Sequence, residues 1–125
     1  MALPSLPTQT NYTLRLTLGN ASYWIGVYKN NSAYSYRMVT YTKDGNLTQK
    51  DVYDGTYTGG YASAHNVFDG AIHPTDESIW VAHGNYGIVG YTLDVNGIIT
   101  ETSWVYDGAY TVGSNDFFDV LVTPD

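Results

Sequence analysis

The sequence contains no cysteine, which excludes disulfide bonds and thiolate metal sites. Charged residues are also scarce, at 14% of the chain, where an average globular domain has about a quarter. Five Lys and Arg stand against twelve Asp and Glu, for a net charge of −7. A chain this acidic is repelled by phosphate backbones and anionic lipid, so neither nucleic acid nor a membrane is an expected partner.

Long apolar runs and catalytic motifs are missing as well. No run approaches the roughly 20 residues of a membrane span, and the first eight residues lack the charged and apolar regions of a signal peptide. There is no Gly-x-Ser-x-Gly motif and no phosphate-binding loop. We therefore predict no catalytic residues and no cofactor, and we do not expect an enzyme.

The three histidines, His65, His73 and His83, do not have the spacing of a metal-binding motif. No Asp-x-Asp-x-Asp run is present for calcium. The sequence thus predicts no metal site, and His73, next to Pro74, is expected to be a turn residue.

The sequence is rich in tyrosine and glycine, with thirteen residues of each. Tyr and Thr favour half-buried sheet, whereas Gly and Asn favour tight turns, so the composition predicts an all-β fold. Alternation along 10–18 predicts a strand with Tyr12, Leu14, Leu16 and Leu18 on one face. The Asp-Gly at 44–45 predicts a type I′ hairpin turn. Turn signals about every ten residues delimit nine strands, at 10–18, 23–28, 34–42, 47–53, 67–72, 78–82, 87–93, 98–106 and 117–122.

The chain also repeats itself. Segments 52–58 and 105–111 share the pattern Val-Tyr-Asp-Gly-x-Tyr-Thr, and segments 68–74 and 118–124 both begin with Phe-Asp and end with Pro. The offsets are 53 and 50 residues, which indicates duplicated structural units. We predict an extended arm over 1–10 and a single β domain over 11–125. That domain consists of two four-stranded repeats, 11–66 and 67–116, followed by a C-terminal strand, 117–125.

The second repeat resembles one blade of a lactonase-like (YVTN-type) β-propeller. The resemblance lies in Asp-Gly-Ala-Ile-His-Pro-Thr-Asp-Glu-Ser-Ile-Trp-Val-Ala at 69–82 and Gly-Ile-Val-Gly-Tyr-Thr-Leu-Asp at 87–94. The first repeat departs from it, because Thr-Leu-Gly-Asn at 17–20 stands where a blade has its Pro turn.

This resemblance implies two propeller-like blades in each chain. Propellers need about 4–8 blades, so two blades close a ring only if several chains assemble. Three chains would supply six blades and four would supply eight; we favour a trimer, with the C-terminal strand pairing with the next subunit. The arrangement also resembles small trimeric propeller lectins. The alternative fold is a single β-sandwich or jelly roll whose two sheets are related.

The duplicated loops hold the candidate ligand-binding residues. Asp54 with Tyr57, and Asp107 with Tyr110, follow strand ends at matching places, and a carboxylate beside an aromatic ring suits sugar hydroxyls. The alternative is that these residues only build turns. Trp104 is a further candidate, as a stacking platform or as a packing residue, whereas Trp24 and Trp80 are expected to pack between blades.

Two functions remain open. The first is a self-assembling structural or surface-display protein, such as a decoration protein of a phage capsid or tail, with other virion proteins as partners. The second is a carbohydrate-binding lectin, with glycans as partners. The sequence does not determine the location, and a virion and a cell surface both remain open.

Overall fold

The structure, a computed structural model, describes residues 3–33, 35–56, 67, 69–83 and 87–105, with 104 and 105 described by their backbone alone. Over these residues the chain is all-β, as predicted, and contains no helix. In particular, none of the described residues belongs to a helix long and apolar enough to cross a membrane. The eight strands are β1 Tyr12–Gly19, β2 Tyr23–Asn30, β3 Ser35–Thr42, β4 Gln49–Thr56, β5 Asp69–Ile72, β6 Ile79–Ala82, β7 Ile88–Leu93 and β8 Ile99–Val105.

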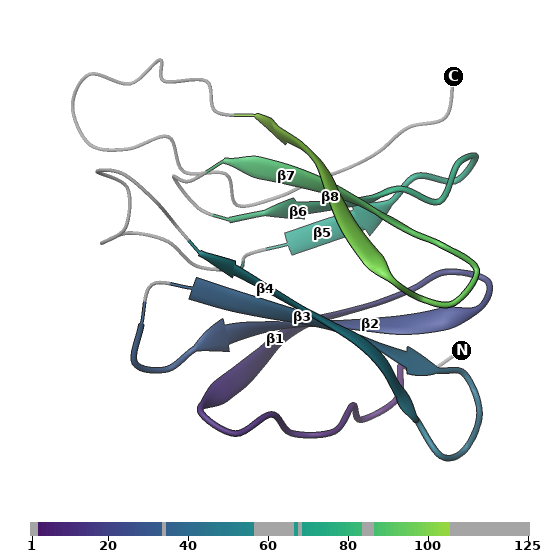
Figure 1. The fold of residues 1–125 in the computed structure, drawn as a ribbon, viewed down its shortest axis with the longest axis horizontal. Coiled ribbons are helices and arrows are strands. Elements are labelled where there is room, and N and C mark those ends of the chain that lie inside the picture. Colours follow the sequence, from purple (N-terminus) through teal and green to yellow (C-terminus); the bar gives the residue numbers. More distant parts are fainter. Residues whose placement is uncertain (1–2, 34, 57–66, 68, 84–86, 106–125) are drawn as a thin grey trace.

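These eight strands confirm the first eight predicted from the sequence, with ends that differ by three residues at most. The ninth predicted strand, 117–122, lies outside the described residues. The strands form two four-stranded antiparallel sheets, the first in the order β1-β2-β3-β4 and the second in the order β5-β6-β7-β8 (Figure 1). Each sheet is thus a meander in which every strand pairs with its neighbour in the sequence.

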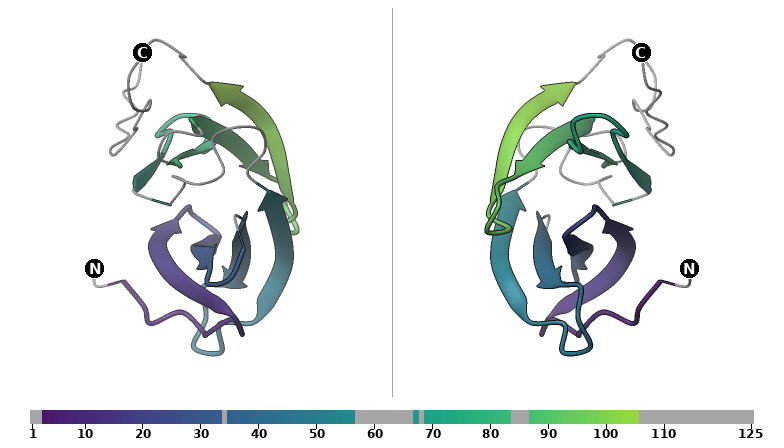
Figure 2. Two further views of the ribbon diagram at one scale, coloured as in Figure 1. Left: turned by 90° about the vertical axis from the view of Figure 1, so that its left-hand side faces the viewer. Right: turned by 90° about the vertical axis from the view of Figure 1, so that its right-hand side faces the viewer.

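The two sheets stack face to face, with β1 against β5 and β4 against β8 (Figure 2). We call the face of each sheet that meets the other sheet its inner face, and the opposite face its outer face. Apolar side chains from both inner faces form the main core. Its buried members are Ile25, Val27, Tyr36, Met38, Val67, Ile79, Val81, Val89, Tyr91 and Ile99.

A β-bulge in β1 overturns the predicted face of that strand. The register shifts between Leu14 and Leu16, because Leu14 pairs with Tyr28 and Leu16 pairs with Val27. A one-residue slip moves the following side chains to the other face. Leu16 and Leu18 therefore pack in the main core, whereas Tyr12 packs on the outer face. The prediction that all four residues share one face is wrong, because Tyr12 and Leu14 precede the bulge and lie on the outer face.

The outer face of the first sheet is apolar too, and the N-terminal arm covers it. Leu6 of the arm joins Tyr28, Val39 and Tyr41 in a second buried cluster. The arm runs along the side of the first sheet that lies away from the second sheet (Figure 1). The first sheet is thus covered on its inner face by the second sheet, and the arm covers part of its outer face.

The two sheets have the same register at equivalent positions. Residues of β2 correspond to residues of β6 that are 55 positions later, and residues of β3 correspond to residues of β7 that are 50 positions later. With these offsets, the pair Ile25–Thr40 corresponds to Trp80–Gly90, and the pair Val27–Met38 corresponds to Ala82–Ile88. Residues of β4 likewise correspond to residues of β8 that are 52 positions later. The β3–β4 ladder has a bulge beside Thr40, and the β7–β8 ladder has one at the equivalent place, beside Gly90. The sheets are therefore two copies of one pattern of pairing.

The register also corrects the repeat that the sequence indicated. In the ladders, Tyr53 lies opposite Met38, and Val105 lies opposite Ile88, the counterpart of Met38. Val105 therefore stands at the position of Tyr53, not at that of Val52. The two Val-Tyr-Asp-Gly elements are one residue out of step, because their sequence offset is 53 and the structural offset is 52.

Equivalent faces of the two sheets point in the same direction. Val39 and Tyr41 lie on the outer face of the first sheet, and their counterparts Val89 and Tyr91 lie on the inner face of the second sheet. The strand directions agree with this, since β4 and β8 point the same way (Figure 1). The sheets are stacked as successive copies, and are not related by a two-fold axis between them.

The β7–β8 turn docks on the first sheet through polar contacts. The Tyr23 hydroxyl donates to the Val95 carbonyl at 2.6 Å, and the buried Thr40 hydroxyl donates to the Gly97 carbonyl at 2.8 Å. The backbone N–H of Ile99 donates to the Asp51 carboxylate at 2.8 Å. These bonds fix one end of the second sheet over the first.

The Asp-Gly hairpin at 44–45 forms, but its turn is not type I′. A type I′ turn needs positive φ at both central residues, whereas in this turn only Leu47 has positive φ, at 49°. The Asp44 carboxylate instead accepts the N–H groups of Asn46 and Leu47. The Thr42 hydroxyl also donates to this carboxylate. The bond from Thr42 is the main cause that holds the pKa of Asp44 below its ordinary value, and the bonds from the two N–H groups add to it.

We predict that Gly97→Ala destabilises the fold by more than about 1 kcal/mol, because a side chain is disfavoured at positive φ. Gly97 has φ of 80°, and an added Cβ would lie 3.1 Å from the Tyr23 ring. Urea unfolding measures the effect. Gly45→Ala is the matched control, since an added Cβ there meets no atom within 4 Å. Equal stability of the two variants would contradict the prediction.

Candidate functional site

Of the five candidate ligand-binding residues, Asp54 has a described side chain. Asp54 lies on the outer face of β4, with its side chain 53% exposed. The structure describes Trp104 by its backbone, which pairs with Val89 in β8. Tyr57, Asp107 and Tyr110 lie outside the described residues. The site is therefore built from Asp54 outward.

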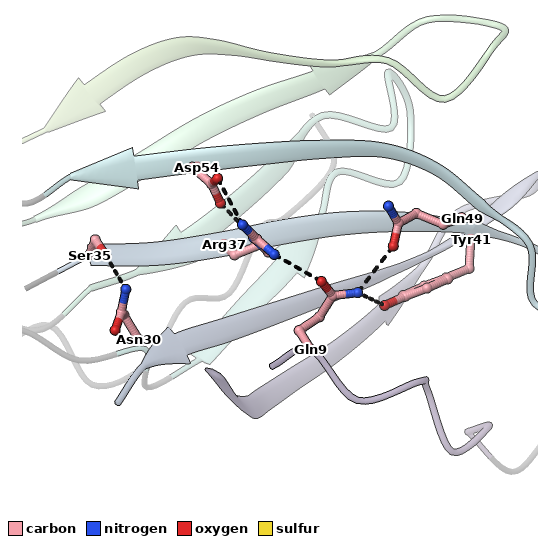
Figure 3. A network of polar contacts seen from close by, with 7 residues as sticks. All are labelled: Gln9, Asn30, Ser35, Arg37, Tyr41, Gln49 and Asp54. Carbon is pink, nitrogen blue, oxygen red and sulfur yellow. Dashed lines mark hydrogen bonds and ion pairs between the residues drawn. The ribbon is translucent and has the colours of Figure 1, made fainter. Parts of the chain in front are cut away.

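Asp54 forms a two-pronged ion pair with Arg37, the residue opposite it in β3. Arg37 Nε lies 2.7 Å from Asp54 Oδ1, and Nη2 lies 3.0 Å from Oδ2 (Figure 3). The hydrogen bonds that Arg37 donates to Asp54 are the main reason why the pKa of Arg37 is raised above its ordinary value. Both carboxylate oxygens of Asp54 are thus already bonded to a cation.

The Arg37 guanidinium also joins the pair to the arm and to β1. Its Nη1 donates to Gln9 Oε1 at 3.0 Å, and its carbon lies 4.4 Å from the centroid of the Tyr12 ring. A cation over an aromatic face is attracted by the ring quadrupole. One face of Tyr12 is consequently covered by Arg37, which removes that face as a platform for a sugar ring.

Gln9 extends the network across the face of the first sheet. Its Nε2 donates to the Tyr41 hydroxyl and to Gln49 Oε1, each at 3.1 Å (Figure 3). A second contact in the same view, from Asn30 Nδ2 to the Ser35 hydroxyl at 3.0 Å, joins the ends of β2 and β3. One amide side chain of the arm therefore bonds to three residues, two on β3 and one on β4.

Two buried tyrosines lie beneath this network. The hydroxyls of Tyr28 and Tyr41 are 2.6 Å apart, and Tyr28 donates to the Pro7 carbonyl at 2.7 Å. Burial is the main cause that raises the pKa of Tyr28, and the hydrogen bond with Tyr41 adds to it. The phenol is therefore neutral near pH 7, and it acts as a hydrogen-bonding group rather than as a base.

A second polar cluster lies between the sheets. His83 Nε2 is 3.0 Å from the Tyr91 hydroxyl, which donates to the Tyr36 hydroxyl at 2.7 Å. The His83 and Tyr36 rings lie 4.3 Å apart, and all three residues are buried. Close by, Tyr53 packs edge-on against Tyr91 and donates to Glu101 at 2.6 Å. These bonds satisfy polar groups inside the core.

The structure places the other singled-out residues in packing and turn positions. Trp24 and Trp80 are half-buried, but both lie on outer faces and not between the sheets. Trp24 contacts Lys43, whose Nζ lies 4.2 Å from the ring centroid, and Trp80 Nε1 donates to the Ser78 hydroxyl. His73 Nδ1 accepts the N–H of Thr75, which confirms it as a turn residue. Within the described ranges, no three His, Asp or Glu residues gather as metal ligands would.

Sequence reasoning missed Arg37 as the partner of Asp54 because a bulge sets their pairing. Tyr41 pairs with Gln49, and Thr40 pairs with Asp51, so Lys50 is left without a partner in the ladder. Counting outward from Tyr41–Gln49 without this bulge would place Arg37 opposite Tyr53. The residue types alone could not locate the bulge.

Comparison of the chain with protein-family models, curated proteins and solved structures found no match.

We predict that the Arg37–Asp54 pair stabilises the fold only modestly, because both side chains contact water. Exposed ion pairs contribute about 0.2–1 kcal/mol, and salt screens them. A double-mutant cycle with Arg37→Ala and Asp54→Ala, measured by urea unfolding, gives the coupling energy. A coupling of several kcal/mol, or one unchanged in 1 M salt, would contradict this expectation.

Proposed function

We propose that this protein is a non-enzymatic structural or surface-display protein that assembles with copies of itself, as a decoration protein of a phage capsid or tail would. The observation that carries this function is the same-direction stacking of the two sheets. Because the copies stack in one direction, the two ends of the stack present different faces. The outer face of the first sheet is the counterpart of the inner face of the second sheet, and the inner face of the first sheet is the counterpart of the outer face of the second sheet.

Each outer face therefore repeats the pattern of a face that already packs inside the chain. On the outer face of the second sheet, small and apolar residues stand at the counterparts of core residues of the first sheet. Trp80 takes the place of Ile25, Ala82 that of Val27 and Ile88 that of Met38. Head-to-tail contact between such faces closes into a ring when the rotation allows it.

This stacking supports two propeller-like blades per chain, with three chains in a six-bladed ring as the favoured assembly. Propellers are built from four-stranded meanders around a central channel, and each sheet of this chain is a four-stranded meander. A single two-sheet sandwich is the alternative, and it needs no further chains to complete the fold. The non-enzymatic role rests on the sequence, which has no cysteine and no catalytic or phosphate-binding motif.

A carbohydrate-binding function is the second candidate, and the exposed Asp54 at the end of β4 favours it. A carboxylate at the rim of a rigid sheet suits sugar hydroxyls, and Asp54 stays 53% exposed within its ion pair. Against it, Arg37 occupies both carboxylate oxygens and one face of Tyr12.

Assembly is tested by native mass spectrometry of the full chain from low to high micromolar concentration. We expect a species of three chain masses. Ile88→Asp should weaken it, since Ile88 stands on the outer face of the second sheet, whereas Ile98→Asp should not, because Ile98 lies in the β7–β8 turn and is 42% exposed. Circular dichroism confirms that both variants fold. A monomer at every concentration, for the wild-type chain and for a Leu6→Ala variant that loosens the arm, would rule out assembly of the chain with itself.

The lectin function is tested with a glycan array that covers broad sugar classes. If it is correct, the wild-type chain binds at least one class, and Asp54→Asn loses that binding because a neutral amide replaces the carboxylate. Ser35→Ala serves as the control, because Ser35 lies on the same face, two positions along β3 from Arg37, and its loss leaves the Asp54 carboxylate in place. An array on which the wild-type chain binds no glycan would refute the function.

A further inference from the structure

The N-terminal arm covers the outer face of the first sheet with one buried side chain. Leu6 is 7% exposed and packs with Tyr28, Val39 and Tyr41, whereas Leu3 in the same arm is 62% exposed. A Cβ added to Gly26 would lie 3.0 Å from Leu6 Cδ1, so the glycine leaves room for Leu6. The arm therefore fits this face at one point along its length.

The polar contacts of the arm are also few. Pro7 accepts a hydrogen bond from Tyr28, and Gln9 bonds to Tyr41, Gln49 and Arg37. Residues 3–9 form no strand. The arm is therefore held on the first sheet by side chains and by the Pro7 carbonyl, and not by a β-ladder. Segments with few buried contacts open at low cost, and the first sheet would keep every strand if the arm left.

The outer face of the first sheet, which lies under the arm, is the counterpart of the inner face of the second sheet, and that inner face already packs against another sheet. Trp24 and Tyr28 of the outer face correspond to Ile79 and His83, and its Val39 and Tyr41 correspond to Val89 and Tyr91. Those counterparts pack against the first sheet inside the chain. The polar detail matches as well, since Tyr28 bonds to Tyr41 and His83 bonds to Tyr91. The covered face thus has the pattern of a surface that receives another sheet.

From this geometry we infer that the arm is an assembly gate. In the closed state, Leu6 and Gln9 occupy the outer face of the first sheet. In the open state, the arm leaves, and the outer face of the second sheet of another copy takes its place. This gate presupposes the self-assembly proposed above and adds the contact that regulates it. It would keep newly made chains from joining before the arm is displaced.

The apolar side chains of the two surfaces suit this exchange. The incoming face carries the half-buried Trp80 and Ile88, beside Ala82, which is already buried within the chain. Their counterparts in the first sheet pack against a sheet within the chain. Apolar surface on both sides favours their contact with each other over contact with water. A second copy would bury this face over several strands, whereas the arm covers it with one leucine and one glutamine.

The test compares Leu6→Ala with Leu3→Ala in the full chain by sedimentation equilibrium over a concentration series. Both variants remove the same atoms from the same arm, but only Leu6 is buried. Loosening the closed state raises the fraction of competent chains, so Leu6→Ala should lower the apparent dissociation constant about tenfold or more. Leu3→Ala should stay within about twofold of the wild-type chain.

A second variant, Gln9→Ala, loosens the arm while the apolar contact of Leu6 stays, and it should shift association in the same direction by a smaller factor. Hydrogen exchange confirms that β2 and β3 become less protected in Leu6→Ala monomers than in Leu3→Ala monomers. If the wild-type chain associates and neither loosened variant associates more tightly, the gate is refuted while self-assembly stands. If no variant associates at any concentration, self-assembly fails and the gate fails with it.

Discussion

A sheet with apolar side chains on both faces cannot leave either face in water, and this constraint shapes the whole chain. The first sheet directs Ile25 and Met38 to one side and Val39 to the other. The second sheet covers the first side, and the arm covers the other. The arrangement of the chain follows from the need to bury these two faces, because the hydrophobic effect is the dominant favourable contribution to folding.

The many tyrosines meet this constraint with polar atoms that must also be satisfied. A tyrosine supplies a large apolar ring, but its hydroxyl needs a partner when it is buried. On the outer face of the first sheet, Tyr28 and Tyr41 bond to each other, and between the sheets Tyr91 bonds to Tyr36 and His83. The same solution thus occurs at counterpart positions in the two sheets. The polar network of the arm continues the first of these clusters to the surface, where Arg37 and Asp54 meet water.

The sequence predicted the strands well and their registers poorly. Periodicity and turn residues locate strands because both act locally. Bulges act on pairing, and the bulges beside Leu14 and Thr40 moved Leu16 to the inner face and placed Arg37 opposite Asp54. The Val-Tyr-Asp-Gly repeat misled for the same reason, since similarity of residues put it at an offset of 53 where the ladders require 52. Gly55 in that element has a packing reason, because the Tyr36 ring lies where its Cβ would be.

By itself, the sequence determined the all-β class, the two four-stranded units and the turns between strands, since these depend on neighbours a few residues away. Tertiary structure decided which face each strand presents, which cation pairs with Asp54 and what covers the outer face of the first sheet. Each of these depends on contacts between segments far apart in the chain. The Pro residues of the arm predict that it is extended. Only the packing of Leu6 over Gly26 and of Gln9 against Arg37 shows which surface it occupies.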